Sequence, residues 1–378
     1  MIQTAPDLQQ KLGVLSADAQ YDLSCACGSS PDDRRRRGLD NRWLYPVTLQ
    51  NGGKGLMFKT LVSNVCANDC KYCPLRAQQD RAVRCTLSPE EIVRAFLPYW
   101  QAGEVIGLFL TSGVCGSPDA AMSRMIATAE LLRRRERFRG VLHLKIIPGA
   151  SDAAIDRALQ LASAVSLNIE TAGAAHFARL TARKDYLQSV IEPMKRIARL
   201  TAKGAKHERV KTSTQFVVGA SDETDRDVVR YMGGLYERLG MNRVYFSAYQ
   251  RGLGDPSIPG ETRATSNADM LAREHRLYQT DFLLRKYGFG ADEIGFDEQG
   301  HLPLDVDPKA YWAGRHPERF PVDINRAGRA DLLRVPGLGP ESVRRILAVR
   351  KEGRRLASLE GIGLRASIVR TARPWIRS

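Results

Sequence analysis

Six short apolar runs, each followed by a segment with the pattern of a helix, constrain the fold of this chain more than any other feature. The helical patterns include SPEEIVRAFLPYW and DAAMSRMIATAELLRRRERF. Strands that alternate with helices in this way pair in parallel through right-handed crossovers, so an α/β fold is predicted. The predicted strands are residues 57–63, 106–112, 141–147, 164–170, 212–218 and 243–249.

The predicted strands are apolar on both sides of the pleat, which is typical of parallel strands buried on both faces. The first intervening helix has a clear start, with Ser88 in the N-cap position followed by Pro89 and Glu90. Six such units form either an open sheet or an incomplete barrel. In both folds the chemistry lies at the carboxyl ends of the strands.

Three cysteines follow directly on the first predicted strand, in the segment CANDCKYC that runs from Cys66 to Cys73. The chain has seven cysteines, an odd and unevenly spaced set that does not suit a secreted disulfide framework. The N-terminus lacks the pattern of a signal peptide, and no apolar stretch reaches the ~18 residues of a membrane span. A cytoplasmic location is expected, where clustered thiols more often bind metal or carry out redox chemistry.

Three thiolates without a fourth partner favour an iron–sulfur cluster over a zinc site. Structural zinc takes four protein ligands, but Cys85 lies twelve residues beyond the triplet and the nearest histidine is His143. Iron–sulfur clusters are held by cysteine thiolates, normally four of them. Three thiolates on a four-iron cluster leave one iron open to a substrate or cofactor.

The pattern C-x3-C-x-aromatic-C after a first strand resembles the radical S-adenosylmethionine (SAM) superfamily. The resemblance implies a partial (β/α)6, TIM-like barrel and a [4Fe-4S] cluster bound by Cys66, Cys70 and Cys73. It implies SAM bound at the free iron through its amino and carboxylate groups. An electron, from a donor such as flavodoxin or ferredoxin, would cleave SAM to methionine and a 5′-deoxyadenosyl radical, which abstracts hydrogen from the substrate.

The same resemblance suggests contacts to SAM at successive strand ends. Tyr72 matches the family's aromatic residue that lies against adenine. The second strand ends in TSG, where the family usually has a GGE-like turn, and this chain lacks the Glu. Lys145 either contacts the methionine carboxylate or forms a salt bridge at the barrel rim. The full set of expected SAM contacts is Tyr72, Ser112, Gly113, Lys145, Ser166, Asn168 and Glu170, with Gln215 a weaker candidate.

The four remaining cysteines are Cys25, Cys27, Cys85 and Cys115. They match a second cluster in number but not in spacing, and free cysteine is commonly a small buried apolar residue. Some radical SAM DNA repair enzymes return a hydrogen atom from a cysteine, which makes Cys115 and Cys25 candidates for a catalytic role.

The C-terminal segment carries more than half of the chain's net positive charge. Net charge is +15, and residues 311–378 hold 15 Lys and Arg against 6 Asp and Glu, a net of +9. The segment VPGLGPESVRRIL contains a Pro-Gly-Leu-Gly turn before a helix start, where backbone N–H groups suit a phosphate oxygen. This resembles the helix-hairpin-helix motif of DNA repair and uptake proteins, and LEGIGLR resembles a second, degenerate copy. The expected DNA-binding residues are Gly337, Leu338, Gly339, Arg344, Arg345, Gly361 and Gly363.

A radical SAM barrel followed by a helix-hairpin-helix resembles a bacterial family of DNA modification or repair radical SAM proteins. The segments YDLSC, RLYQTDFLLRKYGF and VDINRAG carry the same resemblance. It implies DNA as the substrate and a uracil-DNA-glycosylase-like protein as a partner. The alternatives are a radical SAM enzyme that modifies RNA and a non-catalytic DNA-binding protein whose cluster senses redox state.

Four domains are expected along the chain. They are an N-terminal leader or cap (1–50), the core barrel (51–265), a helical extension and linker (266–320) and a small all-α domain (321–378).

Overall fold

The computed structural model describes residues 6–19, 36–37, 43–48, 53–77 and 83–378. The chain divides into two compact units. The barrel unit comprises residues 1–223 and 234–270, and the C-terminal unit comprises residues 224–233 and 271–378. In the described part of the chain no helix is long and apolar enough to cross a membrane.

The barrel unit is built on one eight-stranded sheet whose strand order follows the sequence from β1 to β8. From β3 onward every neighbouring pair is parallel, whereas β1–β2 and β2–β3 are antiparallel. The strands are β1 (Arg36–Arg37), β2 (Trp43–Thr48), β3 (Lys54–Leu61), β4 (Gly107–Thr111), β5 (Val141–Lys145), β6 (Ala164–Ser166), β7 (Lys211–Val218) and β8 (Arg243–Ala248). The predicted α/β fold with six parallel strands is therefore confirmed. Strands β1 and β2 extend the sheet beyond that prediction.

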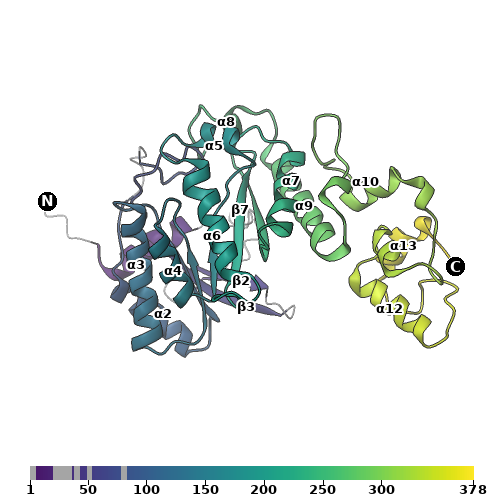
Figure 1. The fold of residues 1–378 in the computed structure, drawn as a ribbon, viewed down its shortest axis with the longest axis horizontal. Coiled ribbons are helices and arrows are strands. Elements are labelled where there is room, and N and C mark those ends of the chain that lie inside the picture. The colour runs from purple at the N-terminus through teal and green to yellow at the C-terminus, as the bar shows by residue number, and fades with distance from the viewer. Residues whose placement is uncertain (1–5, 20–35, 38–42, 49–52, 78–82) are drawn as a thin grey trace. The chain divides into compact units, whose positions relative to one another are not determined.

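Helices connect the parallel strands and lie side by side along one face of the sheet (Figure 1). Ser88 caps the first of them, because its hydroxyl accepts from the Glu91 N–H at 3.1 Å while the Glu91 carboxylate accepts from the Ser88 N–H at 2.8 Å. The α-helices of this unit are α1 (Leu8–Asp18), α2 (Pro89–Gln101), α3 (Pro118–Glu130), α4 (Asp152–Leu161), α5 (Ala174–Leu180), α6 (Glu192–Thr201) and the short α8 (Pro259–Thr262). Helix α7 (Asp225–Glu237) contains residues of both units.

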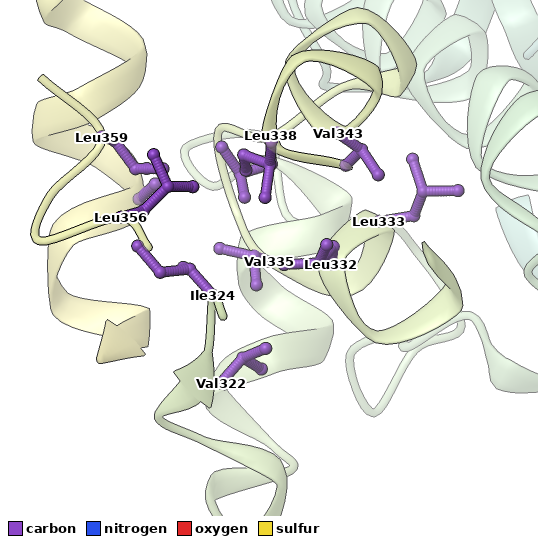
Figure 2. Close-up of a cluster of buried hydrophobic side chains, with 11 residues drawn as sticks. Val322, Ile324, Leu332, Leu333, Val335, Leu338, Val343, Leu356 and Leu359 are labelled. Atoms are coloured by element: carbon purple, nitrogen blue, oxygen red, sulfur yellow. The ribbon is translucent and has the colours of Figure 1, made fainter. Parts of the chain in front are cut away.

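The C-terminal unit has its own hydrophobic core. Eleven buried apolar residues form this core, including Leu332, Leu338 and Val343 (Figure 2). The final strand β10 (Ile376–Arg377) pairs in parallel with β9 (Val322–Asp323) and closes the unit. Its helices are α10 (Pro308–Gly314), α11 (Arg329–Arg334), α12 (Pro340–Lys351) and α13 (Ala366–Ala372), preceded by α9 (Asn267–Phe282), which spans the unit boundary.

Candidate functional site

The three clustered cysteines lie in the loop that follows β3, at the carboxyl edge of the parallel sheet. The Gly113 N–H, just after β4, donates to the Ser63 carbonyl at 2.7 Å, and the Ala67 N–H donates to the Val114 carbonyl at 2.9 Å. These bonds join the segments that follow β3 and β4. They hold the cysteine loop at the carboxyl edge of the sheet. The cysteines therefore lie where an α/β fold is expected to carry its chemistry.

Two of the sulfur atoms accept hydrogen bonds from backbone N–H groups. The Val114 N–H donates to Cys66 Sγ and the Leu75 N–H donates to Cys73 Sγ, both at 3.4 Å. Burial, reinforced by the nearby Cys70 thiol, raises the pKa of Cys73 to about 12. Ligation to a metal cluster offsets the cost of burying a thiolate, because the thiolate then faces positive charge. Hydrogen bonds from N–H groups to the sulfurs help to set the reduction potential of iron–sulfur clusters.

The donor set suits a cluster and does not suit a single metal ion. In the described ranges no group of three or more His, Cys, Asp or Glu side chains is arranged to hold one ion. In a [4Fe-4S] cluster each thiolate binds a different iron, so the three sulfurs need not converge on one point. Cys66, Cys70 and Cys73 fit that requirement.

A second segment, Leu180–Lys184, is fastened against the cysteine loop. The Asp69 carboxylate accepts from the Thr181 hydroxyl and from the Ala182 N–H at 2.8 Å, and the Lys71 N–H donates to the Leu180 carbonyl at 2.8 Å. These contacts bring Lys184 to the cavity, where it hydrogen-bonds Cys70. Burial alone would lower the pKa of Lys184, but the Cys70 sulfur and the Glu170 carboxylate outweigh it and raise that pKa.

Lys184 and Asp69 were not predicted from the sequence. Lys184 lies well beyond the fourth parallel strand, and its position depends on contacts between residues more than a hundred positions apart. The residues around Lys184 in the sequence therefore do not indicate that its side chain reaches the cysteines.

A cavity opens at this edge of the sheet and brings most of the predicted site residues together. Its wall contains the three cysteines and side chains from the ends of β4, β5, β6 and β7. The predicted residues that line it are Cys66, Cys70, Tyr72, Cys73, Ser112, Gly113, Lys145, Asn168, Glu170 and Gln215.

Glu170 is held in an unusual backbone conformation at the centre of this wall. Its φ is +67°, a left-handed value that costs a non-glycine residue about 1–3 kcal/mol. The Glu170 N–H donates to the Gln215 carbonyl at 3.0 Å, and the Val217 N–H donates to the Glu170 carbonyl at 2.7 Å, so neighbouring β7 holds the conformation. The Tyr72 hydroxyl hydrogen-bonds the Glu170 side chain, and burial together with the Glu170 charge raises the pKa of Tyr72 well above its usual range.

Two other predicted site residues, Ser166 and Cys115, do not line the cavity. The Ser166 hydroxyl contacts His143 Nε2 at 2.9 Å, and Cys115 lies just past Gly113 but outside the cavity wall. Cys25 and Cys27 lie outside the described residues. Cys85 is buried, with its sulfur 3.9 Å from the Lys11 carbonyl of α1.

The predicted nucleic-acid-binding glycines of the C-terminal unit lie in two turns, and the predicted Arg344 and Arg345 lie on α12. Gly337 has a φ of +85°, Leu338 is fully buried in the core, and Gly339 is the N-cap of α12. Gly361 and Gly363 also have positive φ, and Arg345 donates to the Gly363 carbonyl, so the two turns are linked. Arg344 and Arg345 are paired with the exposed Glu341 at 2.7 and 3.0 Å.

The buried side chain of Lys309 contacts the first of these turns. Lys309 Nζ donates to the Leu333 carbonyl at 3.2 Å and to the Leu338 carbonyl at 2.5 Å, and it lies over the Tyr287 ring. Burial lowers the pKa of Lys309 to about 7, and the nearby Asp307 charge only partly opposes this effect. Lys309 is a positioning residue for the turn because it ties the end of α11 to the start of α12.

The Lys309 pKa predicts a pH-dependent stability. An unfolded lysine has a pKa of 10.5, so between about pH 7 and pH 10.5 the unfolded state binds more protons than the folded state. Stability should rise with pH through this window, by on the order of 4 kcal/mol for this residue. Urea unfolding at pH 6.5 and pH 10 should show that the stability of the wild type increases relative to Lys309→Met. Parallel pH profiles for the two proteins would contradict the prediction.

Comparison with known proteins gives a family match for the central part of the chain. Residues 60–233 match the family model of the Radical SAM superfamily, which uses a [4Fe-4S] cluster and SAM. No curated protein sequence matches the chain.

Three solved structures resemble the chain over part of its length. HydG from Carboxydothermus hydrogenoformans, an FeFe-hydrogenase maturase, is 17% identical with a TM-score of 0.46, and the match covers 60% of this chain and 51% of HydG. A second structure of HydG is 14% identical (TM-score 0.43, 60% and 50% covered), as is Streptococcus suis SuiB (TM-score 0.42, 60% and 46% covered). The chain spans about half the length of these structures.

Proposed function

We propose that this chain, whose residues 60–233 match the family model of the Radical SAM superfamily, uses SAM-derived radical chemistry to modify or repair DNA. The proposal rests mainly on one observation. The chain joins a three-cysteine cavity to a separate cationic unit that carries two glycine turns. The superfamily match supports the cofactor chemistry, and the cationic unit supports a nucleic-acid substrate.

In this proposal Cys66, Cys70 and Cys73 hold the cluster, which when bound supplies the electron that cleaves SAM to a hydrogen-abstracting radical. The buried Glu170 carboxylate, oriented by the Tyr72 hydroxyl and 3.4 Å from Asn168 Nδ2, is suited to accept hydrogen bonds from the ribose of SAM. Lys145 supplies a positive charge for the methionine carboxylate.

The DNA contact is assigned to a helix-hairpin-helix formed by α11, the turn at Gly337–Gly339 and α12. The Gly339 side of the turn opens the twelve-residue helix α12, whose first N–H groups lack helical partners and suit a phosphate oxygen. Among the residues that the structure describes, Arg344 and Arg345 are bound only to Glu341 and the Gly363 carbonyl. Because fully exposed ion pairs contribute little to stability, a DNA phosphate can replace Glu341 at little cost.

DNA binding should depend on the two hairpin arginines. The double variant Arg344→Gln, Arg345→Gln is expected to bind duplex DNA about tenfold more weakly at ~100 mM salt and to lower the salt slope of log K by about 2, since each lost phosphate contact removes about 0.9. Fluorescence anisotropy over a salt series measures both quantities. The matched control is Lys203→Gln, Lys206→Gln, two exposed charges in the barrel unit just before β7.

Equal losses in the hairpin variant and the control would contradict a specific hairpin contact. Competition between duplex DNA and structured RNA tests the substrate class. RNA that displaces labelled DNA at much lower concentration than unlabelled DNA does would favour the RNA-modifying alternative.

A further inference from the structure

We infer that the C-terminal unit has a second phosphate-binding site, at the carboxyl end of α12, separate from the hairpin turn. A groove there is lined by Asn325, Arg326, Arg350, Lys351, Arg354 and Arg355, which we call the basic groove. The inference rests on the proposed function and extends it, because it gives nucleic acid a second point of attachment on this unit.

The cations of the basic groove are largely free to bind an anion. Arg326, Lys351 and Arg355 are exposed, and their side chains form no ion pair or hydrogen bond within the described part of the chain. Asp323 attracts Arg326 from outside ion-pair distance, and Arg354 is paired with Glu352 at 2.6 Å. The groove therefore retains an excess of positive charge.

The walls of the basic groove are fixed by hydrogen bonds to the backbone. The Asn325 side chain donates to the Leu356 carbonyl at 2.9 Å and accepts from the Leu356 N–H at 2.8 Å. Leu356 is itself buried in the core of the unit (Figure 2). Arg350 donates to the Ala327 carbonyl at 2.6 Å, which ties α12 to the opposite wall. The free cations are thus carried on a rigid frame and need little reorganisation to bind a ligand.

The distance from the hairpin turn makes this a separate site. Helix α12 has twelve residues, which at ~1.5 Å per residue places its two ends about 18 Å apart. One phosphate cannot contact both ends, whereas a nucleic-acid strand presents a phosphate every ~3.4 Å along a duplex axis. The helix dipole disfavours an anion at a carboxyl end, so the cations must supply the attraction.

The surroundings favour nucleic acid over a lipid surface. Membrane binding by a basic surface is usually reinforced by exposed apolar or aromatic side chains. Of the described residues, the large exposed apolar ones are Val65, Val83, Leu187, Phe282 and Leu304, and none lies in the 311–378 segment. The basic groove offers charge and hydrogen-bond donors, and the one large apolar side chain in its lining, Leu347, is partly buried against the core of the unit.

The test compares two triple variants of the full-length protein. The groove variant is Arg326→Gln, Lys351→Gln, Arg355→Gln, and the control is Lys203→Gln, Lys206→Gln, Arg209→Gln, which removes the same charge from exposed positions of the barrel unit. Anisotropy with duplex DNA should show at least a tenfold weaker affinity and a salt slope lower by about 2–3 for the groove variant only. Its losses should multiply with those of the Arg344→Gln, Arg345→Gln variant, because Arg345 and Lys351 lie about 9 Å apart along α12 and the two sets share no hydrogen-bond partner among the described residues.

The outcomes distinguish failure of the basic groove from failure of the proposed function. If the groove variant binds DNA as the control does while the hairpin variant binds weakly, the basic groove is refuted and the proposed function stands. If the wild type binds no nucleic acid, both fail. Phosphatidylserine vesicles form a further arm: vesicle binding lost in the groove variant, without DNA binding by the wild type, would assign the groove to a membrane. Unchanged thermal unfolding of the variants confirms that they remain folded.

Discussion

Replacing Cys70 with alanine is expected to abolish both the cluster and SAM cleavage. Cys70 is buried between the other two cysteines of the loop, and Lys184 faces its sulfur. The two thiolates that remain cannot hold four irons, so bound iron should fall from about four per chain to near zero after anaerobic reconstitution. Formation of 5′-deoxyadenosine should drop more than ~100-fold, since even indirect contacts to a metal site cost 10–100-fold when removed.

Two other cysteines provide the matched controls for this result. Cys85→Ala and Cys115→Ala should retain the iron and the absorption of the wild type, because neither sulfur lines the cavity. Cys115→Ala would change the product distribution if this residue returns a hydrogen atom to the substrate, and unchanged products would remove that role. A Cys70→Ala protein that keeps a full complement of iron would contradict the assignment of the cluster ligands.

Gly113→Ala is expected to lose most of the cluster although Gly113 is not a ligand. A Cβ atom at this position would lie 2.5 Å from the Val65 carbonyl oxygen and 3.2 Å from Cys66 Cβ. The cysteine loop must then move, which carries Cys66 away from its partners. We expect about tenfold less bound iron after reconstitution, together with a loss of about 1–3 kcal/mol in stability from overpacking.

Ser112→Ala is the control for this steric effect. Its hydroxyl donates to the carbonyl of its sequence neighbour Gly113, at 2.7 Å, so its removal leaves the approach of the two loops unchanged. Iron content close to that of the wild type is expected. Full cluster occupancy in Gly113→Ala would show that the loop accommodates a methyl group and that the close approach is not needed.

The parallel sheet could be predicted because each strand is a continuous apolar run with a helix behind it. That topology also places the strand ends at one edge, which is why residues as distant as Cys66 and Gln215 were expected near one another. Strands β1 and β2 were missed because β1 has only two residues and the apolar run of β2 is interrupted by Pro46, a residue that normally argues against a strand. The left-handed conformation of Glu170 was missed because it is imposed by β7 rather than by its own segment.

In the C-terminal unit too, local features could be predicted from the sequence and contacts between distant residues could not. Its glycine turns were visible in the sequence because positive φ values favour glycine. The burial of Lys309 against the first turn was not visible, since a lysine side chain is normally exposed. The sequence did not distinguish the site at Arg350 and Lys351 from the hairpin. The folded unit does, because it places these two residues at the opposite end of α12 from the hairpin turn.

The most direct test of the account is whether the reduced protein cleaves SAM and whether DNA increases that cleavage. The protein is reconstituted anaerobically with iron and sulfide, reduced and incubated with SAM, and 5′-deoxyadenosine is measured by mass spectrometry with and without duplex DNA. We predict formation in the wild type, stimulation by DNA, and none in Cys70→Ala. A fully loaded cluster that yields no 5′-deoxyadenosine under any of these conditions would contradict the account and favour a DNA-binding redox sensor.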